Sequence, residues 1–476
     1  MKLLLATIFV VGCSKPNPNS CCTSADQCNT LGLDGLTACK SGQVCDPYGA
    51  CVKPQCATSA DCTSPDAPLC VDQLCVAKCS ANGDCDGIAG KPFCASDGTC
   101  VACEDDTACS GDTPICDAVS HACRGCAVDT ECSSGVCLEQ QGVCADAANV
   151  VFIQSGGLDN GTCSESAPCA SFAFALPQTS SQRNIIRVRG VSFDVGGSTV
   201  NFSLRTLFID GEDTVVTRST PGAVFTVGSG SMTFEGMAVG TGGGSNESVS
   251  VTGGVVDLNH MRVLAPIAQT GGTLTVETST VAADVNCSNG GTLTVRGNAM
   301  TASVAASGCI STIQRNRITD AQTTIYLDGS TSVFENNVLV DHGSFLDGVN
   351  IANGATARFN TLVNLSGVDS GAMSLSCNGT VEATSNIIAW HSSHPPCASK
   401  YSLFDEIAGT QPGMGNVTGN AASFFVDPAG GDFHLATGSP AVGAGEPGLP
   451  VMVDIDGNPR PNPMGSSPDI GAYEAP

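Results

Sequence analysis

The stretch from Val255 to Ala389 decides the fold. Its middle reads Val295-Arg296-Gly297-Asn298-Ala299-Met300, followed later by Ile313-Gln314-Arg315-Asn316-Arg317-Ile318. The same pattern returns every 18 to 26 residues, with apolar residues three before and two after a polar bend residue. The bend positions are Asn259, Ser279, Asn298, Asn316, Asn337, Asn360 and Asn386. A repeat that cannot bury its apolar side alone must stack on its neighbours, so the pattern predicts a parallel β-solenoid.

The bend column predicts a corner in each coil. The two apolar columns are five residues apart, and a straight strand would place them on opposite faces. Both face the interior only if the chain turns between them. Asn tolerates the left-handed conformation that such a corner requires, and its amide can bond to the Asn of the next coil. We therefore expect a structural ladder formed by Asn259, Asn298, Asn316, Asn337, Asn360 and Asn386.

Composition agrees with many short strands. The chain has 476 residues, 56 of them glycine, with 5% aromatic and 13% charged residues, which is poor material for an α/β enzyme core. Its length allows two or three domains. The net charge of −26 argues against a nucleic-acid partner. An acidic polysaccharide would be repelled unless Ca²⁺ bridged it to the protein.

The first twenty residues predict export. Leu3 to Val11 is apolar but too short to span a bilayer, as in a signal peptide. Val10-Val11-Gly12-Cys13 resembles the bacterial lipobox, whose cysteine receives lipid and becomes the first mature residue. The resemblance implies a signal peptide over 1–12, lipidation at Cys13 and a tether over 13–20. Ser14 after the cysteine implies transfer to the outer membrane. An ordinary signal peptide with a chance cysteine is the alternative.

Residues 21–147 form a cysteine-rich array. They hold 22 of the 29 cysteines, and after an irregular first unit four units open with Cys-x5-Cys at 23- or 24-residue intervals. Units with so few large apolar residues require covalent bridges, so we expect disulfides made in an oxidising compartment. Zinc is the less favoured alternative, because the Cys-x2-Cys gaps fall between units. For the acids of the x5 loops we expect a solvated face, with weak Ca²⁺ binding as the alternative.

The spacing of this array resembles short cysteine-rich repeats in surface proteins of predatory and gliding deltaproteobacteria, including myxobacteria. That resemblance implies a spacer or an adhesion stalk.

Residues 148–424 form the predicted head. Val150-Val151-Phe152-Ile153, the loop 156–162, Pro168 and the segment 171–176 resemble the entry of pectate-lyase-like right-handed parallel β-helices. The resemblance implies an all-β fold whose open end is covered by a short helix near 170–176. Between Ile185 and Trp390 we count about ten coils. Three cysteine pairs are well placed to form disulfides. They are Cys163 with Cys169, Cys287 with Cys309, and Cys377 with Cys397.

Catalytic chemistry has weak support. Lyases need a base beside a carboxylate and hydrolases need paired acids. From residue 148 onward Lys400 is the one lysine, and polygalacturonase-type motifs are absent. The charged column before the bend predicts a ladder of ion pairs between coils, including Glu277 with Arg296 and Glu335 with Arg358. The alternative is a face for an anionic ligand, formed by Arg296, Arg315, Arg317 and Arg358.

Two further clusters have functional alternatives. His391, His394 and Cys397 have a spacing that suits a metal, but we expect Cys397 to be bridged within a proline-containing loop. Segment 425–476 contains Asp454-Ile455-Asp456-Gly457 and ends with Asp469-Ile470-Gly471-Ala472-Tyr473-Glu474. It resembles the terminal segment of choice-of-anchor-type bacterial surface β-helix proteins. We expect a structural cap held by ion pairs and hydrogen bonds, rather than a Ca²⁺ or catalytic site.

These patterns together predict a lipoprotein anchored to the outer membrane, with a structural, adhesive or glycan-binding role and no catalysis. Its expected partners are the membrane, through the lipid, and a polysaccharide or another cell surface. The alternative is a polysaccharide lyase or glycoside hydrolase that acts on an acidic polysaccharide. The sequence assigns no catalytic residue, no metal ligand and no resident cofactor, and leaves only Ca²⁺ open.

Overall fold

A computed structural model describes most of the chain from residue 21 to residue 476. The described residues are 21, 22, 28, 39–46, 49–56, 61, 64, 67, 69–71, 74–76, 82, 90–139, 141–203, 205–211, 213–240, 247–319, 324–329, 331–341, 348–365, 375–390, 397–406 and 411–476. The predicted lipidation site Cys13, together with His391 and His394, lies outside them. The chain divides into two compact units, 1–147 and 148–476.

The N-terminal unit is a series of two-stranded hairpins. They are β1 (Val44–Cys45) with β2 (Cys51–Val52), β3 (Leu69–Val71) with β4 (Leu74–Val76), β5 (Phe93–Cys94) with β6 (Cys100–Val101), β7 (Ile115–Cys116) with β8 (Cys123–Arg124), and β9 (Cys137–Leu138) with β10 (Val143–Cys144). The last two units bond their first cysteine to the third and their second to the fourth. These bridges are Cys103–Cys116, Cys109–Cys123, Cys126–Cys137 and Cys132–Cys144.

In three successive units of the array, the polar residue three positions after the first cysteine has a structural role. The side-chain oxygens of Asn82, Asp106 and Asp129 accept the backbone N–H of Cys94, Cys116 and Cys137, at 2.8, 2.7 and 2.8 Å. Each bond ties the x5 loop to the hairpin. Asp106 is exposed and Asp129 is partly exposed, as expected of a solvated acidic face, and the carboxylate of each also accepts a backbone N–H.

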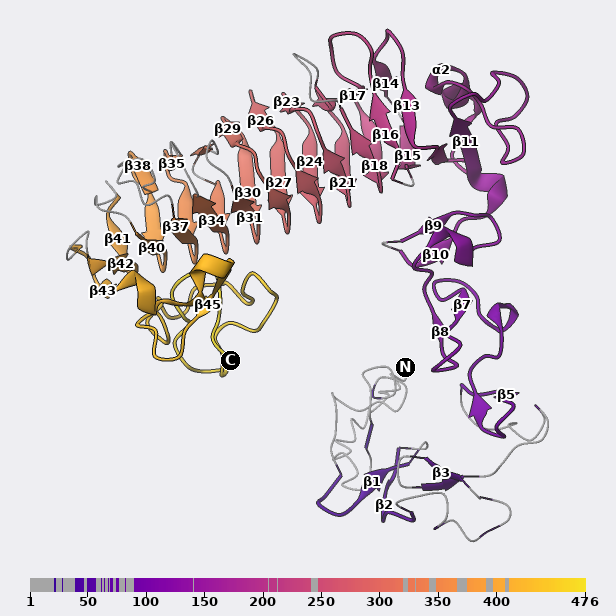
Figure 1. The fold of residues 1–476 in the computed structure, drawn as a ribbon, viewed down its shortest axis with the longest axis horizontal. Coiled ribbons are helices and arrows are strands. Elements are labelled where there is room, and N and C mark those ends of the chain that lie inside the picture. The colour runs from indigo at the N-terminus through magenta and orange to yellow at the C-terminus, as the bar shows by residue number, and fades with distance from the viewer. Residues whose placement is uncertain are drawn as a thin grey trace, which may run out of the picture. The chain divides into compact units, whose positions relative to one another are not determined.

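The C-terminal unit is a parallel β-helix with three long sheets (Figure 1), which confirms the predicted fold class. The first sheet contains β11 (Val150–Gln154), β12 (Ile185–Arg189), β15 (Arg205–Asp210), β18 (Gly230–Glu235), β21 (Val255–Asn259), β24 (Thr273–Glu277), β27 (Thr292–Arg296), β30 (Ile310–Gln314), β33 (Val333–Glu335), β36 (Thr356–Arg358), β39 (Glu382–Thr384) and β41 (Ser399–Lys400). Within each strand, residues that face the interior alternate with residues that face outward.

The second sheet follows the corner of each coil. It contains β13 (Ser192–Asp194), β16 (Val215–Thr217), β19 (Ala238–Val239), β22 (Arg262–Val263), β25 (Thr280–Val281), β28 (Ala299–Met300), β31 (Arg317–Thr319), β34 (Val338–Asp341), β37 (Thr361–Asn364), β40 (Ile387–Ala389), β42 (Leu403–Asp405) and β43 (Val417–Gly419).

The third sheet closes each coil. It contains β14 (Val200–Phe202), β17 (Phe225–Val227), β20 (Val249–Val251), β23 (Ile267–Gln269), β26 (Val285–Ser288), β29 (Val304–Ser307), β32 (Ile325–Asp328), β35 (Val349–Ala352) and β38 (Leu375–Asn378). Nine described coils therefore carry all three strands, which agrees with the estimate of about ten.

The open end of the apolar stack is covered as expected, by a shorter helix than predicted. Helix α2 (Phe172–Ala175) continues into the 3-10 helix η6 (Leu176–Gln178). The ring of Phe172 packs edge-on against Phe193, Phe202 and Phe225. The preceding loop is closed by the Cys163–Cys169 bridge, and Cys287–Cys309 and Cys377–Cys397 are also bonded. No helix among the described residues has the length and apolar character needed to cross a membrane.

The Asn ladder is continuous from Asn298 to Asn386. Each amide group donates to the carboxamide oxygen of the next, at 3.0, 2.9, 3.1 and 3.0 Å. Each of these amides also donates to a backbone carbonyl of the preceding coil, such as Val295 O for Asn316. The left-handed residue is the one before each ladder position, for example Arg315 with φ 59°. The expectation that the Asn itself takes this conformation is therefore wrong.

Asn259 does not belong to the ladder. Its register partner is Glu277, which pairs in turn with Arg296, so Asn259 lies in the charged column. His260, with φ 49°, is the left-handed residue of this coil, and Met261 follows it in the ladder position. The prediction was two residues out of register here. Because side chains alternate with a period of two, a two-residue shift keeps apolar residues inside and leaves no contradiction in the pattern.

The C-terminal segment 425–476 packs against the side of the β-helix, along the later coils (Figure 1). Phe425, Phe433, Ile455 and Ile470 join a second apolar cluster with outward residues of the second sheet. Those outward residues are Val338, Val340, Val363, Ile387, Ala389 and Leu403. The segment is therefore a lateral cover and not a lid on the end of the stack. It includes β44 (Phe425–Asp427) and β45 (Asp432–Leu435).

Candidate functional site

The charged column on the first sheet is a set of ion pairs between coils. Arg296 Nη2 lies 2.5 Å from Glu277 Oε1, and Arg358 Nε lies 2.5 Å from Glu335 Oε2. Each partner occupies the matching register position in the neighbouring coil. The geometry fits the predicted ladder, and the guanidinium groups of Arg296 and Arg358 are engaged within it.

Arg315 and Arg317 contact the C-terminal segment. Arg315 Nε donates to Ile455 O at 3.3 Å. Arg317 Nη2 lies 2.5 Å from Asp456 Oδ1. The other carboxylate oxygen of Asp456 lies 2.8 Å from His434 Nε2, and His434 Nδ1 lies 2.6 Å from Asp432 Oδ1. We call Arg317, Asp456, His434 and Asp432 the docking cluster, because it joins the segment to β31.

The electrostatics of the docking cluster favour the charged forms. Burial alone would lower the pKa of His434, but its hydrogen bonds to Asp432 and Asp456 outweigh burial and raise that pKa. The hydrogen bond from His434 lowers the pKa of Asp432. Burial raises the pKa of Tyr473, whose ring centroid lies 4.3 Å from that of His434. The shift favours the protonated form of His434, which pairs with Asp432 and Asp456 as Arg317 pairs with Asp456.

The aspartates of the C-terminal segment are already hydrogen-bonded. Asp454 accepts the backbone N–H groups of Asp456, Asn458 and Glu474 and the side chain of Asn458, at 2.8 to 3.1 Å. These four bonds use both carboxylate oxygens, as in a structural turn rather than a vacant Ca²⁺ site.

A buried ion pair anchors the same segment. Arg460 Nε lies 3.4 Å from Glu474 Oε2, with both side chains almost fully buried. The guanidinium also donates to Asp469 O and Gly471 O, and it stacks 4.3 Å from the ring centroid of Phe359. Burial lowers the pKa of Arg460, opposed first by the charge of Glu474. This network holds the segment against the coils.

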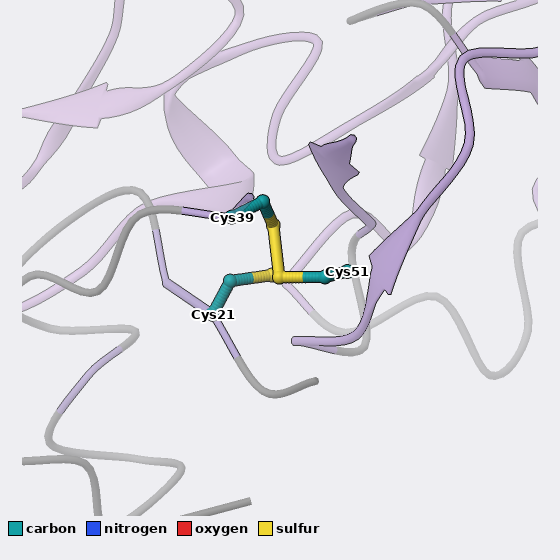
Figure 2. A group of neighbouring side chains, drawn as sticks. All are labelled: Cys21, Cys39 and Cys51. Carbon is teal, nitrogen blue, oxygen red and sulfur yellow. A yellow bond between two sulfur atoms is a disulfide. The ribbon is translucent and has the colours of Figure 1, made fainter. Parts of the chain in front are cut away.

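Among the described residues, three groups of cysteines have sulfur atoms within 4.8 Å of one another. Figure 2 shows the side chains of Cys21, Cys39 and Cys51 converging. Cys39 is bonded to Cys51, and Cys21 is bonded to Cys45. Metal ions bind thiolates, and a disulfide sulfur carries no thiolate. The convergence is therefore the packing of neighbouring bridges.

The outer face of the third sheet has a different character from the other two. Its outward residues are small or polar except for one tyrosine, and all of them but the buried Ala352 are partly or fully exposed. They are Asn201, Thr226, Ser250, Ala268, Asn286, Ser288, Ala305, Ser307, Tyr326, Asp328, Asn350, Ala352, Ser376 and Asn378. Tyr326 and Asp328 project outward from β32, because the alternating residues Ile325 and Leu327 of the same strand are fully buried. We call Tyr326, Asp328 and their neighbours Ala305, Ser307 and Asn350 the Tyr326 face.

The Tyr326 face was not expected from the sequence. The available signal was the alternation Ile325-Tyr326-Leu327-Asp328, which directs a tyrosine and an acid to the outside of the same strand. The lateral cover was not expected either. There the signal was the change to strands that are apolar at consecutive positions, such as Val338-Leu339-Val340, because strands buried on both faces lose their alternation.

Among solved structures, the chain is similar to the crystal structure of pectate lyase Pel9A. The identity is 15%, the match covers 74% of this chain and 100% of that chain, and the TM-score is 0.42. No family model matches the chain. No curated protein matches it. The assignment to the parallel β-helix fold follows from the three sheets themselves.

Proposed function

We propose that this protein is a lipoprotein anchored to the outer membrane, whose β-helix head has an adhesive, glycan-binding role without catalysis. One observation supports the absence of catalysis. Four of the basic side chains that could abstract a proton beside a carboxylate are held in the protein's own ion pairs. Lys400 Nζ lies 2.7 Å from Glu446 Oε1, and Arg296, Arg317 and Arg358 are paired as described above.

This pairing of the basic side chains is a poor arrangement for a lyase. A general base must be able to accept a proton, and a cation paired with a carboxylate is held in its charged form. For Lys400, the hydrogen bond to Glu446 raises the pKa, which removes it further from the range of a general base. A binding role requires no such group.

The test uses the Cys13→Ala variant of the full-length chain. We expect it to bind glycans on an array and to release no unsaturated uronate from pectin, alginate or glycosaminoglycans, with or without Ca²⁺. Uronate release that is lost in Arg296→Ala or Arg317→Ala would show an enzyme and contradict the proposal. Membrane fractionation of the wild type and Cys13→Ala tests the anchor separately, since Cys13→Ala that stays with the membrane would contradict lipidation.

A further inference from the structure

The Tyr326 face combines one aromatic side chain with short neighbours. In the preceding coil the register partners of Tyr326 and Asp328 are Ala305 and Ser307. A methyl and a hydroxymethyl group cannot rise to the height of a tyrosine side chain about 4.8 Å away. The side chain of Tyr326 therefore rises above the sheet surface on this side, where only the short side chains of Ala305 and Ser307 lie beside it. On the other side its register partner is Asn350.

A hydrogen bond fixes the orientation of the Asp328 carboxylate beside Tyr326. Asn353 Nδ2 donates to Asp328 Oδ1 at 2.6 Å. The hydroxyl of Tyr326 lies 3.4 Å from Asp328 Oδ2, a long contact that leaves this oxygen able to accept a stronger hydrogen bond. A carboxylate oriented by an amide is a preorganised acceptor for a ligand hydroxyl.

The charge of this face selects against anions. None of the described outward residues of the third sheet is basic, and the carboxylate of Asp328 is negative. The whole chain carries a net charge of −26. A uronate, sulfate or phosphate would meet repulsion here without a cation to pair with.

The chemistry of the face matches an uncharged sugar. A pyranose ring presents C–H groups on its faces and hydroxyl groups around its edge. Tyrosine offers a rigid, largely apolar surface at a low cost in conformational entropy. Carboxylate, amide and hydroxyl side chains around it pair with sugar hydroxyls.

We propose that the Tyr326 face is a binding subsite for an uncharged glycan. A pyranose ring packs over Ala305 and Ser307 against Tyr326, and one of its hydroxyls donates to Asp328. This inference rests on the proposed glycan-binding role, for which it names the site and the ligand class.

The experiment measures binding of the full-length Cys13→Ala chain to neutral oligosaccharides (β-glucan, mannan and chitin fragments) and to acidic ones (polygalacturonate and alginate). The variants are Tyr326→Ala, Tyr326→Phe and Asp328→Asn. The matched control is Thr294→Ala, an outward residue of the first sheet. All four variants are compared with the wild type in thermal unfolding, so that a folding defect is recognised.

We expect neutral glycans to bind, Tyr326→Ala to weaken binding about tenfold or more, and Tyr326→Phe and Thr294→Ala to bind within about twofold of the wild type. Asp328→Asn is expected to weaken binding less than Tyr326→Ala. Neutral binding that survives Tyr326→Ala, or binding of acidic glycans alone, would overturn the inference and leave the proposed function standing. Binding to no glycan would overturn both.

Discussion

Asn316 is the residue whose replacement tests the corner ladder most directly. Its side chain makes four hydrogen bonds. It donates to Val295 O and Asn337 Oδ1, both at 2.9 Å, and it accepts from the backbone N–H and the side-chain amide of Asn298, both at 3.0 Å. Asn316 is fully buried, so water cannot replace the lost partners in Asn316→Ala.

The magnitude follows from the number of bonds. At about 1 kcal/mol net for each hydrogen bond, Asn316→Ala should lose about 4 kcal/mol of local stability. Ser279 occupies the same column but makes only two such bonds, to Glu277 O at 2.7 Å and from Met261 N at 3.0 Å. Ser279→Ala should therefore lose about 2 kcal/mol. The difference between the two variants is the quantity to measure.

Amide hydrogen exchange is the suitable assay, because a stack of repeats can open locally without unfolding as a whole. Four kcal/mol corresponds to roughly a thousandfold faster opening at the Asn298 amide, against roughly thirtyfold for Ser279→Ala at the Met261 amide. Thr280→Ala, at an exposed outward position next to the corner, is the neutral control. If Asn316→Ala opened no faster than Ser279→Ala, the hydrogen-bond ladder would not be what stabilises the corner.

Three further outcomes are expected. The pKa of His434 is raised in the folded state, so its contribution to docking is fully present below about pH 6.5 and is lost as the pH rises through the folded pKa. Proteolysis of segment 425–476 should therefore become faster as the pH rises through that pKa. The variant His434→Gln should show no such dependence of proteolysis on pH. Arg460→Ala leaves Glu474 buried without its partner and should cost about 3–5 kcal/mol in denaturant unfolding, most of it recovered in Arg460→Met with Glu474→Gln. Replacing Cys109 and Cys123 by Ser opens a bridge with a sequence separation of 14 and should cost about 3 kcal/mol, measured as the shift in unfolding of residues 103–123 under oxidising conditions.

The fold was predictable because several positions of each coil, two of them interior and one at the corner, carry the same type of residue in successive coils. Val276, Val295 and Ile313 occupy one interior column, and Val281, Met300 and Ile318 occupy the other, as expected. The corner residues could be identified by type, because the same amide recurs from Asn298 onward. The failure at Asn259 has a specific cause. Val255-Val256-Asp257-Leu258-Asn259 alternates in a way that satisfies two registers two residues apart, and only the position of the left-handed residue distinguishes them.

The partners of the arginines were predictable only where they lie in the repeat. Glu277 with Arg296 is a contact between equivalent positions of adjacent coils, so the period reveals it. Arg317 with Asp456 joins residues 139 positions apart, and no periodicity connects them. The alternative of an anionic-ligand face included Arg315 and Arg317, whose partners belong to the C-terminal segment.

The outer faces of the three sheets of the β-helix differ in what each offers a ligand. The first sheet presents charges that are paired with one another, and breaking such a pair would cost a ligand part of its binding energy. The second sheet changes at β34 from exposed outward residues, such as Thr319 of β31, to buried ones, such as Val340 and Val363, because apolar residues of segment 425–476 pack on it from there onward. The outward residues of the third sheet are small or polar apart from Tyr326, most of them are partly exposed, and Tyr326 lies beside an oriented carboxylate. Among the described residues, no ion pair and no covering segment occupies the Tyr326 face, so a ligand that binds there displaces neither.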